Sequence, residues 1–194
     1  MQNLSVSEDG GKTWNKIPDK AGGFGCLVAF ADAKTGWLGF GDKFQMTTDG
    51  GKTWKELALP KGVSKVAAVS LRTPTDGYLV DADGVLHITQ DGGKTWSSRS
   101  LGLNNPSIMG FVSEGFVNEI PQAAVRFTDK NHGLVVLGLT GRTAMIALRT
   151  ANGGKTWKEE SLPAKLFGAA YISRDGKFVT INKWGEGTTL LKYE

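Results

Sequence analysis

One eight-residue segment occurs four times in this chain, and it restricts the possible folds more than any other feature. Each copy, which we call an octet, ends in Gly-Gly-Lys-Thr-Trp and has Ser or Thr two residues before an Asp, or before an Asn in the last copy. The octets occupy residues 7–14, 47–54, 89–96 and 150–157. Recurrence at this length indicates a repeat architecture, in which one structural unit is built several times.

The spacing of the octets and the residues between them distinguish strands from helices. The Asp or Asn positions are 9, 49, 91 and 152, so the intervals are 40, 42 and 61 residues. Such periods occur in helical arrays and in β-propellers. No segment has sustained helical periodicity, whereas short apolar runs such as 36–40 and 66–71 lie between Gly- and Asp-rich turns. These runs predict antiparallel strands.

Each repeat contains three expected strands before its octet and one after it. Four strands in about 41 residues correspond to one blade of a β-propeller. The sequence therefore predicts an all-β fold, a single β-propeller domain of about four to five blades over residues 1–194. The expected divisions are a partial blade at 1–17, blades at 24–58, 64–99 and 123–160, a partial blade at 167–194, and an insertion at 101–122.

The octet is expected to form the hairpin between the third and fourth strands of a blade. The Asp carboxylate can accept hydrogen bonds across the turn, and the Ser or Thr hydroxyl can close the loop. The glycines supply positive φ angles, and the tryptophans are expected to bury their rings beside the hairpin or between blades. Asn152 keeps the acceptor without the charge, so its turn should also form. The structural residues are Ser7, Asp9, Gly11, Trp14, Thr47, Asp49, Gly51, Trp54, Thr89, Asp91, Gly93, Trp96, Thr150, Asn152, Gly154 and Trp157.

These octets resemble the Asp-box, or BNR repeat, whose pattern is Ser/Thr-x-Asp-x-Gly-x-Thr-Trp. The resemblance covers all four octets and, through the strand spacing, most of the chain. Families with this repeat include sialidases, xyloglucanase-type glycoside hydrolases, sortilin-type receptors and photosystem II assembly/stability factor-like proteins. The dense Asp-Gly-Gly-Lys-Thr-Trp form and the turn at 32–37 are most similar to the last group. The resemblance implies a β-propeller and leaves the function open, because the motif is specific for a turn.

The chain begins and ends at the same point of the repeat. Its first expected strand and its last are both the third strand of a blade. Propellers usually close by pairing their chain ends in one blade, which hides open sheet edges. Three arrangements are therefore open: part of a longer propeller of six to eight blades, a compact ring of four or five blades with one displaced strand, or two open arcs that form a homodimer.

A binding site is expected on the face opposite the octets. In a propeller, the octet hairpins and the first-to-second strand turns share one face, while the second-to-third strand loops and the connections between blades share the other. Long non-repeating loops on a regular scaffold tend to carry function, although the insertion could also be a decorative hairpin or cap an open edge. The candidate residues for a ligand or partner are Asp42, Asp81, Asp83, Glu114, Phe116, Glu119, Arg142, Trp184 and Glu186.

Several classes of function are disfavoured by the composition. The net charge is +4, but no basic cluster is interleaved with aromatic residues, so nucleic-acid binding is not expected. No apolar run of about 18 residues predicts a membrane span, and the N-terminus has no pattern of a signal peptide. Cys26, His87 and His132 do not form a metal-ligand pattern, so neither a metal nor a cofactor is expected. The compartment is left open.

Two functions remain. The first is a noncatalytic scaffold that binds a protein partner or a ligand through the face with the insertion. The second is a glycoside-hydrolase-like propeller, related to sialidases, that acts on or binds carbohydrate. Most glycoside hydrolases need two facing carboxylates, and the sequence does not identify such a pair. The resemblance to sialidases would instead require an arginine triad and a tyrosine nucleophile with a glutamate, and the three tyrosines are Tyr78, Tyr171 and Tyr193. The Arg-Ile-Pro motif of sialidases is absent, because Ile-Pro follows Lys16 and Glu119.

Overall fold

A computed structural model describes residues 5–17, 27–40, 43–104, 106, 108, 110–111, 120–142, 144–163, 166–183 and 187–193. All regular structure in these residues is β-sheet, and every strand pairing is antiparallel. The described residues contain no helix that could cross a membrane. The predicted all-β propeller is confirmed.

Three sheets share one four-stranded plan, in which strands adjacent in sequence are adjacent in the sheet. Gly-rich and Asp-rich turns separate short apolar runs, so each run pairs with the next as a meander. The first sheet contains β3 (Leu27–Phe30), β4 (Gly36–Phe40), β5 (Lys43–Thr47) and β6 (Lys55–Glu56). The second contains β7 (Val66–Leu71), β8 (Gly77–Asp81), β9 (Val85–Thr89) and β10 (Ser97–Ser100). The third contains β13 (Ala123–Phe127), β14 (Gly133–Leu137), β15 (Ile146–Thr150) and β16 (Lys158–Ser161).

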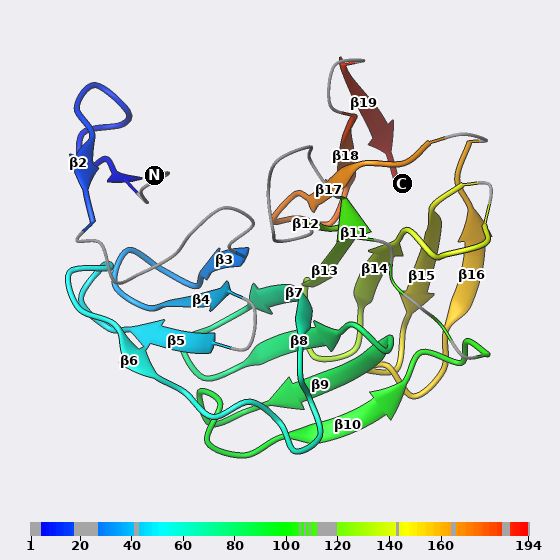
Figure 1. Cartoon of the computed structure of the whole chain (residues 1–194), viewed down its shortest axis with the longest axis horizontal. Helices are drawn as coiled ribbons and strands as arrows, with labels where there is room; N and C mark the ends of the chain where they lie inside the picture. The colour runs from blue at the N-terminus through cyan, green and yellow to red at the C-terminus, as the bar shows by residue number, and fades with distance from the viewer. Residues whose placement is uncertain are drawn as a thin grey trace.

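Shorter sheets complete the described structure. A hairpin is formed by β1 (Ser5–Val6) and β2 (Asn15–Lys16), and a three-stranded sheet by β17 (Ala169–Ile172), β18 (Phe178–Lys183) and β19 (Gly187–Lys192). Two strands inside the insertion, β11 (Gly110–Phe111) and β12 (Ile120–Pro121), pair with each other. The larger sheets follow one another as blades around an arc, with β3, β7, β13 and β17 innermost and in contact from sheet to sheet (Figure 1).

Each octet closes its hairpin with its own side chains. Thr89 Oγ1 accepts a hydrogen bond from Gly93 N at 2.9 Å and donates one to Asp91 Oδ1 at 2.8 Å. The Asp91 carboxylate also accepts from Thr95 N at 2.9 Å and from Thr95 Oγ1 at 2.6 Å. The octets that start at residues 7 and 47 make the same four contacts. Gly93 has a φ of 92°, a backbone conformation that favours glycine.

The fourth octet forms the same turn without a carboxylate. Asn152 Oδ1 accepts hydrogen bonds from Thr150 Oγ1 and from Thr156 N, both at 3.0 Å. Asn152 Nδ2 donates to Thr156 Oγ1 at 2.8 Å, so this hydroxyl accepts where its counterparts in the other octets donate. The turn therefore depends on the position of the acceptor oxygen, and the negative charge is not essential for it.

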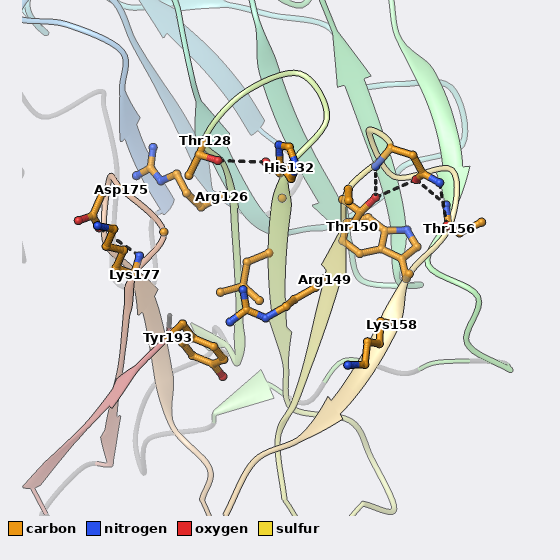
Figure 2. A pocket seen from close by; sticks show the side chains of 16 residues that line it. Arg126, Thr128, His132, Arg149, Thr150, Thr156, Lys158, Asp175, Lys177 and Tyr193 are labelled. Atoms are coloured by element: carbon orange, nitrogen blue, oxygen red, sulfur yellow. Dashed lines mark hydrogen bonds between the residues drawn. The ribbon is translucent and has the colours of Figure 1, made fainter.

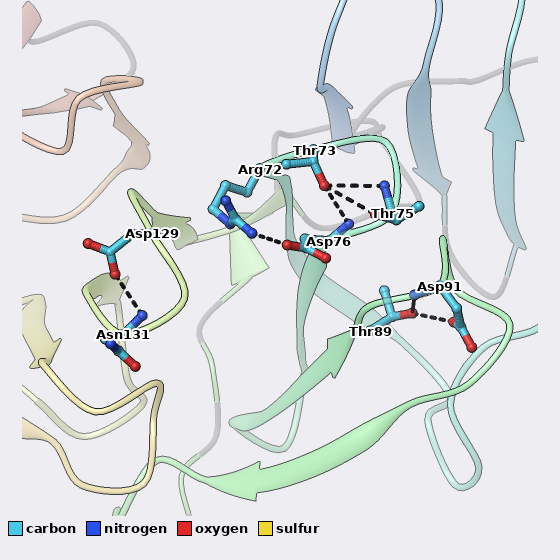
Figure 3. Close-up of polar contacts among 8 residues, drawn as sticks. All are labelled: Arg72, Thr73, Thr75, Asp76, Thr89, Asp91, Asp129 and Asn131. Atoms are coloured by element: carbon cyan, nitrogen blue, oxygen red, sulfur yellow. Dashed lines mark hydrogen bonds and ion pairs between the residues drawn. The ribbon is translucent and has the colours of Figure 1, made fainter.

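Every octet of a four-stranded sheet is also bonded to the first-to-second strand turn of the same sheet. The N–H groups of Gly50, Gly92 and Gly153 donate to the carbonyls of residues 34, 75 and 131 at 2.8–2.9 Å. These turns are closed by side chains too: Thr73 Oγ1 accepts from Asp76 N, and Asp129 Oδ1 accepts from Asn131 N (Figure 3). Octets and first-to-second turns thus lie on one face, which we call the octet face.

Octet tryptophans fill the seams between neighbouring sheets. The ring of Trp96 lies 5.6 Å from that of Trp37 and 6.3 Å from that of Phe44, both in the preceding sheet. In the next seam, Trp157 lies 6.2 Å from Phe127, which stacks on Tyr78 of the preceding sheet at 4.0 Å. Because large rings bury much apolar area, these contacts join separate sheets into shared cores.

Trp14 is not buried, and the expectation that every octet tryptophan is covered is wrong here. Its side chain is 65% exposed. The reason is that the β1–β2 hairpin has a neighbouring sheet on only one side within the described part of the chain (Figure 1). Its Nε1 still donates to Gly11 O at 3.1 Å, as Trp54 Nε1 does to Gly51 O. The turn therefore forms without the seam.

A substitution at Gly77 tests the packing between neighbouring sheets. A Cβ added at Gly77 would overlap the Trp37 ring of the preceding sheet, whereas one added at Gly39 would meet its neighbours at 3.7–3.8 Å. We expect Gly77→Ala to lower the free energy of unfolding by about 1–3 kcal/mol through overpacking. Gly39→Ala should change it by less than about 1 kcal/mol. Urea denaturation measures both, and equal effects of the two substitutions would contradict the packing described here.

The ionised octet carboxylates should make the stability of the folded protein depend on pH in the acid range. Hydrogen bonds lower the pKa of Asp91 from 3.8 to about 2. The largest contribution comes from the Thr95 hydroxyl and the next from the Thr95 N–H. A pKa lowered by folding stabilises the native state above the ordinary pKa, and this contribution is lost as the pH falls from about 4 to 2. Asp91→Asn should therefore lose less stability over this range than the wild type, and Asn152→Asp should lose more. Urea midpoints at pH 6, 4 and 2 measure this, and parallel profiles for all three proteins would refute it.

Candidate functional site

The face opposite the octet face, which we call the loop face, carries the turn at residues 82–84, the loop at 138–142 and the first part of the insertion. Pro106 lies so close to Gly84 that an added Cβ would be 2.6 Å from its Cγ. Ile108 N donates to Ala82 O at 3.4 Å, and Ile108 also bridges to Leu139. The insertion therefore contacts the turns of two neighbouring sheets. Its β11 and β12 strands form a short antiparallel ribbon.

A polar hollow of about 290 Å³ lies where the insertion crosses these turns. Arg142 Nη1 contacts Glu159 Oε1 at 3.2 Å, and the two side chains are 48% and 36% exposed. Exposed ion pairs contribute little to stability because water and salt screen them, so both charges can exchange partners at small cost. The hollow is lined by Gly102, Leu103, Asn104, Pro106, Leu139, Thr140, Arg142 and Glu159.

The structure places three of the nine candidate residues predicted from the sequence. Arg142 lines the loop-face hollow, and Asp83 is exposed on the neighbouring turn. Asp81 is buried, as described below. The other candidates fall outside the described residues: Asp42, Glu114, Phe116, Glu119, Trp184 and Glu186.

Asp81 is not available to a ligand, contrary to the expectation from its loop position. It is 6% exposed, and its Oδ1 accepts a hydrogen bond from Val85 N at 2.8 Å, which closes the β8–β9 turn. Its Oδ2 lies 2.9 Å from His87 Nε2, and His87 Nδ1 lies 2.9 Å from Ser98 Oγ. All three polar groups are satisfied when Nε2–H donates to Asp81 and the Ser98 hydroxyl donates to Nδ1. The strand order therefore brings three distant residues into one hydrogen-bonded row.

The row has the carboxylate–imidazole–hydroxyl order of a catalytic triad, but the surroundings do not support catalysis. None of the three hollows described here is lined by Ser98, and a nucleophile needs a place for its substrate beside it. His87 is 3% exposed, and buried polar groups are normally paired. We interpret the row as the means by which this sheet accommodates a buried histidine. A single sequence offers no signal that pairs these residues, because they lie on three different strands.

A second hollow, of about 260 Å³, follows the innermost strands β3, β7, β13 and β17. Most of the residues that line it are apolar, and several of them are alanines. Arg126 is its only charged lining residue among those described, and no carboxylate lines it. A glycosidase site with two facing acids is therefore not formed by these strand residues.

The third hollow, about 660 Å³, lies on the octet side between the β13–β16 and β17–β19 sheets. Cationic side chains from both sheets line it, among them Arg126, Arg149, Lys158 and Lys177 (Figure 2). This hollow was not predicted from the sequence. The available signal was Arg149, which stands directly before the octet where Met46 and Ile88 occur in the other four-stranded sheets.

Two acidic groups near the hollows, Glu159 and Glu160, are paired with arginines. Glu159 contacts Arg142, and Glu160 Oε2 lies 3.2 Å from Arg149 Nε. Within the described residues, no group of three or more His, Cys, Asp or Glu side chains is placed to hold a metal ion. Among the described lining residues, the loop-face hollow has one carboxylate, Glu159, and the third hollow has one, Asp175.

Comparison with known proteins agrees with this reading of the octets. The family model described as the BNR/Asp-box repeat matches residues 45–56 and 87–98, which include the second octet and the third. The chain contains Asp-box repeats. No curated protein sequence matches it.

Solved structures with a similar fold include both binding proteins and enzymes. YCF48 from Cyanidioschyzon merolae has a TM-score of 0.58 and 18% identity, covering 99% of this chain and 60% of that one. The structure of YCF48 bound to D1 peptide has a TM-score of 0.53 and 20% identity, covering 85% and 54%. A GH74 enzyme from Niastella koreensis has a TM-score of 0.58 and 15% identity, covering 87% and 28%.

This Asp-box chain therefore spans about half to three fifths of the YCF48 chains, and less than a third of the GH74 chain. The TM-scores of 0.53–0.58 show a shared fold, and at identities of 15–20% they show nothing beyond the fold. One fold supports many functions, so the function has to be argued from the residues of this chain.

The Asp81–His87–Ser98 row gives a graded prediction for stability. Asp81→Ala leaves the buried His87 Nε2 and Val85 N without partners, so it should lower the free energy of unfolding by about 1–3 kcal/mol. Ser98→Ala should cost less than about 1 kcal/mol, because Ser98 is exposed and water can replace its hydroxyl. Urea denaturation at pH 7 measures both. A larger loss for Ser98→Ala than for Asp81→Ala would contradict the assignment of Asp81 as the essential partner.

Proposed function

We propose that this protein is a noncatalytic β-propeller scaffold that binds a segment of a protein partner through its loop face. The observation that carries the proposal is the anchoring of the insertion, which contacts Gly84 through Pro106 and Leu139 through Ile108. A loop held by two sheets is positioned by a rigid framework, and binding residues are commonly presented in this way.

The chemistry of the loop-face hollow fits recognition of a polypeptide. Arg142 and Glu159 offer both signs of charge at the surface, while Asn104 and Thr140 add amide and hydroxyl groups. Such charges orient a partner and affect its association rate more than they add to affinity. The fold likeness to the structure of YCF48 bound to D1 peptide supports a peptide as the ligand class.

A carbohydrate-active propeller is the second candidate, and the fold likeness to GH74 enzymes favours it. This function needs two facing carboxylates. Asp42, Glu114, Glu119 and Glu186 lie outside the described residues, and the described part of the hollow contributes only Glu159, which is paired with Arg142. The binding function therefore has more support from the residues described.

Binding to the D1 peptide of the YCF48 complex provides a direct test. Fluorescence anisotropy with labelled peptide should show saturable binding to the wild-type protein. Arg142→Glu should weaken it by about tenfold or more, because the reversed charge lies at the contact surface. Lys94→Glu, an identical charge change on an exposed octet residue, should leave the affinity unchanged. Absence of binding, or equal loss in both variants, would contradict the proposal.

The carbohydrate alternative is tested on xyloglucan, with release of reducing sugar as the measurement. We expect no hydrolysis by the wild-type protein. Hydrolysis that disappears in the double variant Glu114→Gln, Glu119→Gln, while the variant keeps the wild-type melting temperature, would overturn the noncatalytic assignment.

A further inference from the structure

A row of three cations crosses the β13–β16 sheet near its octet end. The strand register places Arg126 opposite Leu134, Leu134 opposite Arg149, and Arg149 opposite Lys158. Side chains in one cross-strand row project from the same side of a sheet and are close neighbours. This row faces the seam with the β17–β19 sheet, where all four side chains line the cavity of about 660 Å³.

The positions of Arg126 and Arg149 are held by uncharged residues in the two other four-stranded sheets, whereas the position of Lys158 is held by Lys55 in one of them. There the octet tryptophan of the following sheet covers the row, as Trp96 covers Trp37 at 5.6 Å. An apolar row suits a tryptophan seam, and a row with two arginines departs from that pattern. The corresponding residues, read from the strand register, are Ala29, Trp37, Met46 and Lys55 in one sheet and Ser70, Tyr78, Ile88 and Ser97 in the other.

Cations outnumber carboxylates around the cavity. Lys177 adds a fourth cation from the β17–β18 turn, and Asp175 is the one carboxylate among the lining residues described. Asp175 Oδ1 already accepts hydrogen bonds from Ser173 Oγ at 2.6 Å and from Lys177 N at 3.1 Å. Glu160, beside the cavity, lies 3.2 Å from Arg149 Nε and 3.9 Å from Lys158 Nζ. The positive charge is thus only partly neutralised.

Arg149 is held in a fixed orientation from two sides. Its Nε donates to Glu160, and its guanidinium carbon lies 4.2 Å from the centre of the Tyr193 ring. Within the described residues, its two terminal nitrogens have no carboxylate or carbonyl partner. A planar guanidinium held in this way presents a fork of donors that matches a carboxylate or phosphate group.

Arg126 has no acidic partner among the described residues, and its Nη1 donates one long hydrogen bond, of 3.5 Å, to Leu71 O of the preceding sheet. Its Nε is buried without a hydrogen-bond partner among the described residues, and so is the hydroxyl of Tyr193. The pKa of Arg126 is lowered from its ordinary value, mainly by burial and to a smaller extent by the positive charge of Arg174. A half-buried cation without a counter-charge costs free energy that a bound anion offsets. Arg149 extends from its strand toward Tyr193 in Figure 2.

We propose that this seam cavity binds a small organic oxyanion, whose carboxylate or phosphate group is held by Arg126 and Arg149. Lys158 and Lys177, which are exposed, lie at its rim and attract the ligand from solution. A volume of about 660 Å³ is within the usual range for small-molecule sites, so it admits more than a single inorganic ion. The cavity and the loop face are formed by different parts of the sheets, so this inference does not depend on the proposed function.

Isothermal titration calorimetry with citrate and, separately, with inorganic phosphate tests the site and distinguishes the two oxyanions. The wild-type protein should bind at least one of them saturably with one site, and the affinity should fall as the salt concentration rises. Arg149→Met, which introduces the residue found at position 46, should weaken binding by about tenfold or more. Arg142→Met, the same change on the loop face, should leave it unchanged.

Two further measurements keep the test decisive. Arg149→Lys retains the positive charge and loses the two-pronged guanidinium donor, so the affinity of this variant for the oxyanion should lie between those of the wild type and Arg149→Met. Melting temperatures measured without ligand show whether each variant is folded. Indole is the uncharged aromatic control, since tryptophans fill the corresponding seams. Indole binding in the absence of oxyanion binding, no binding of either oxyanion, or wild-type affinity in folded Arg149→Met would each overturn the proposal.

Discussion

The closure of each octet by its own side chains is the interaction on which the rest of the structure depends. A threonine or serine hydroxyl and an Asp or Asn oxygen together satisfy N–H groups that a tight hairpin would leave without partners. The closed turn then presents Gly50 N, Gly92 N or Gly153 N to the first-to-second turn of the same sheet. It also directs the tryptophan into the seam, so one local motif sets the hairpin, the octet face and the contact between sheets.

The same interaction removes the octet aspartates from the list of possible catalysts. Both oxygens of Asp49 and of Asp91 accept hydrogen bonds within the turn, and these bonds lower their pKa values to about 2. A carboxylate in this state is neither a general acid near neutral pH nor free to coordinate a ligand. Functional residues are therefore expected where the repeat is interrupted, and the two sites described here lie at such interruptions.

The two interruptions differ in kind. On the loop face, extra chain between two sheets covers the turns that hold Gly84 and Leu139, and it adds a polar hollow without altering the sheets. In the seam beside β17, the chain length is regular and the residue types change, because Arg126 and Arg149 stand at positions that are uncharged in the other four-stranded sheets. A regular scaffold can therefore acquire a site by insertion or by substitution while its turns stay the same.

The sequence by itself determined the features that depend on contacts between near neighbours. The octet turns join residues no more than four positions apart, and the strands 66–71, 123–127 and 133–137 were bounded by glycines and polar turns, so a local pattern sufficed for them. Tertiary structure alone decided which side chains meet across strands and sheets. It buried Asp81 against His87 and Ser98, left Trp14 exposed, and aligned Arg126 with Arg149. These outcomes depend on strand register and on the presence of a neighbouring sheet, neither of which is contained in the order of nearby residues.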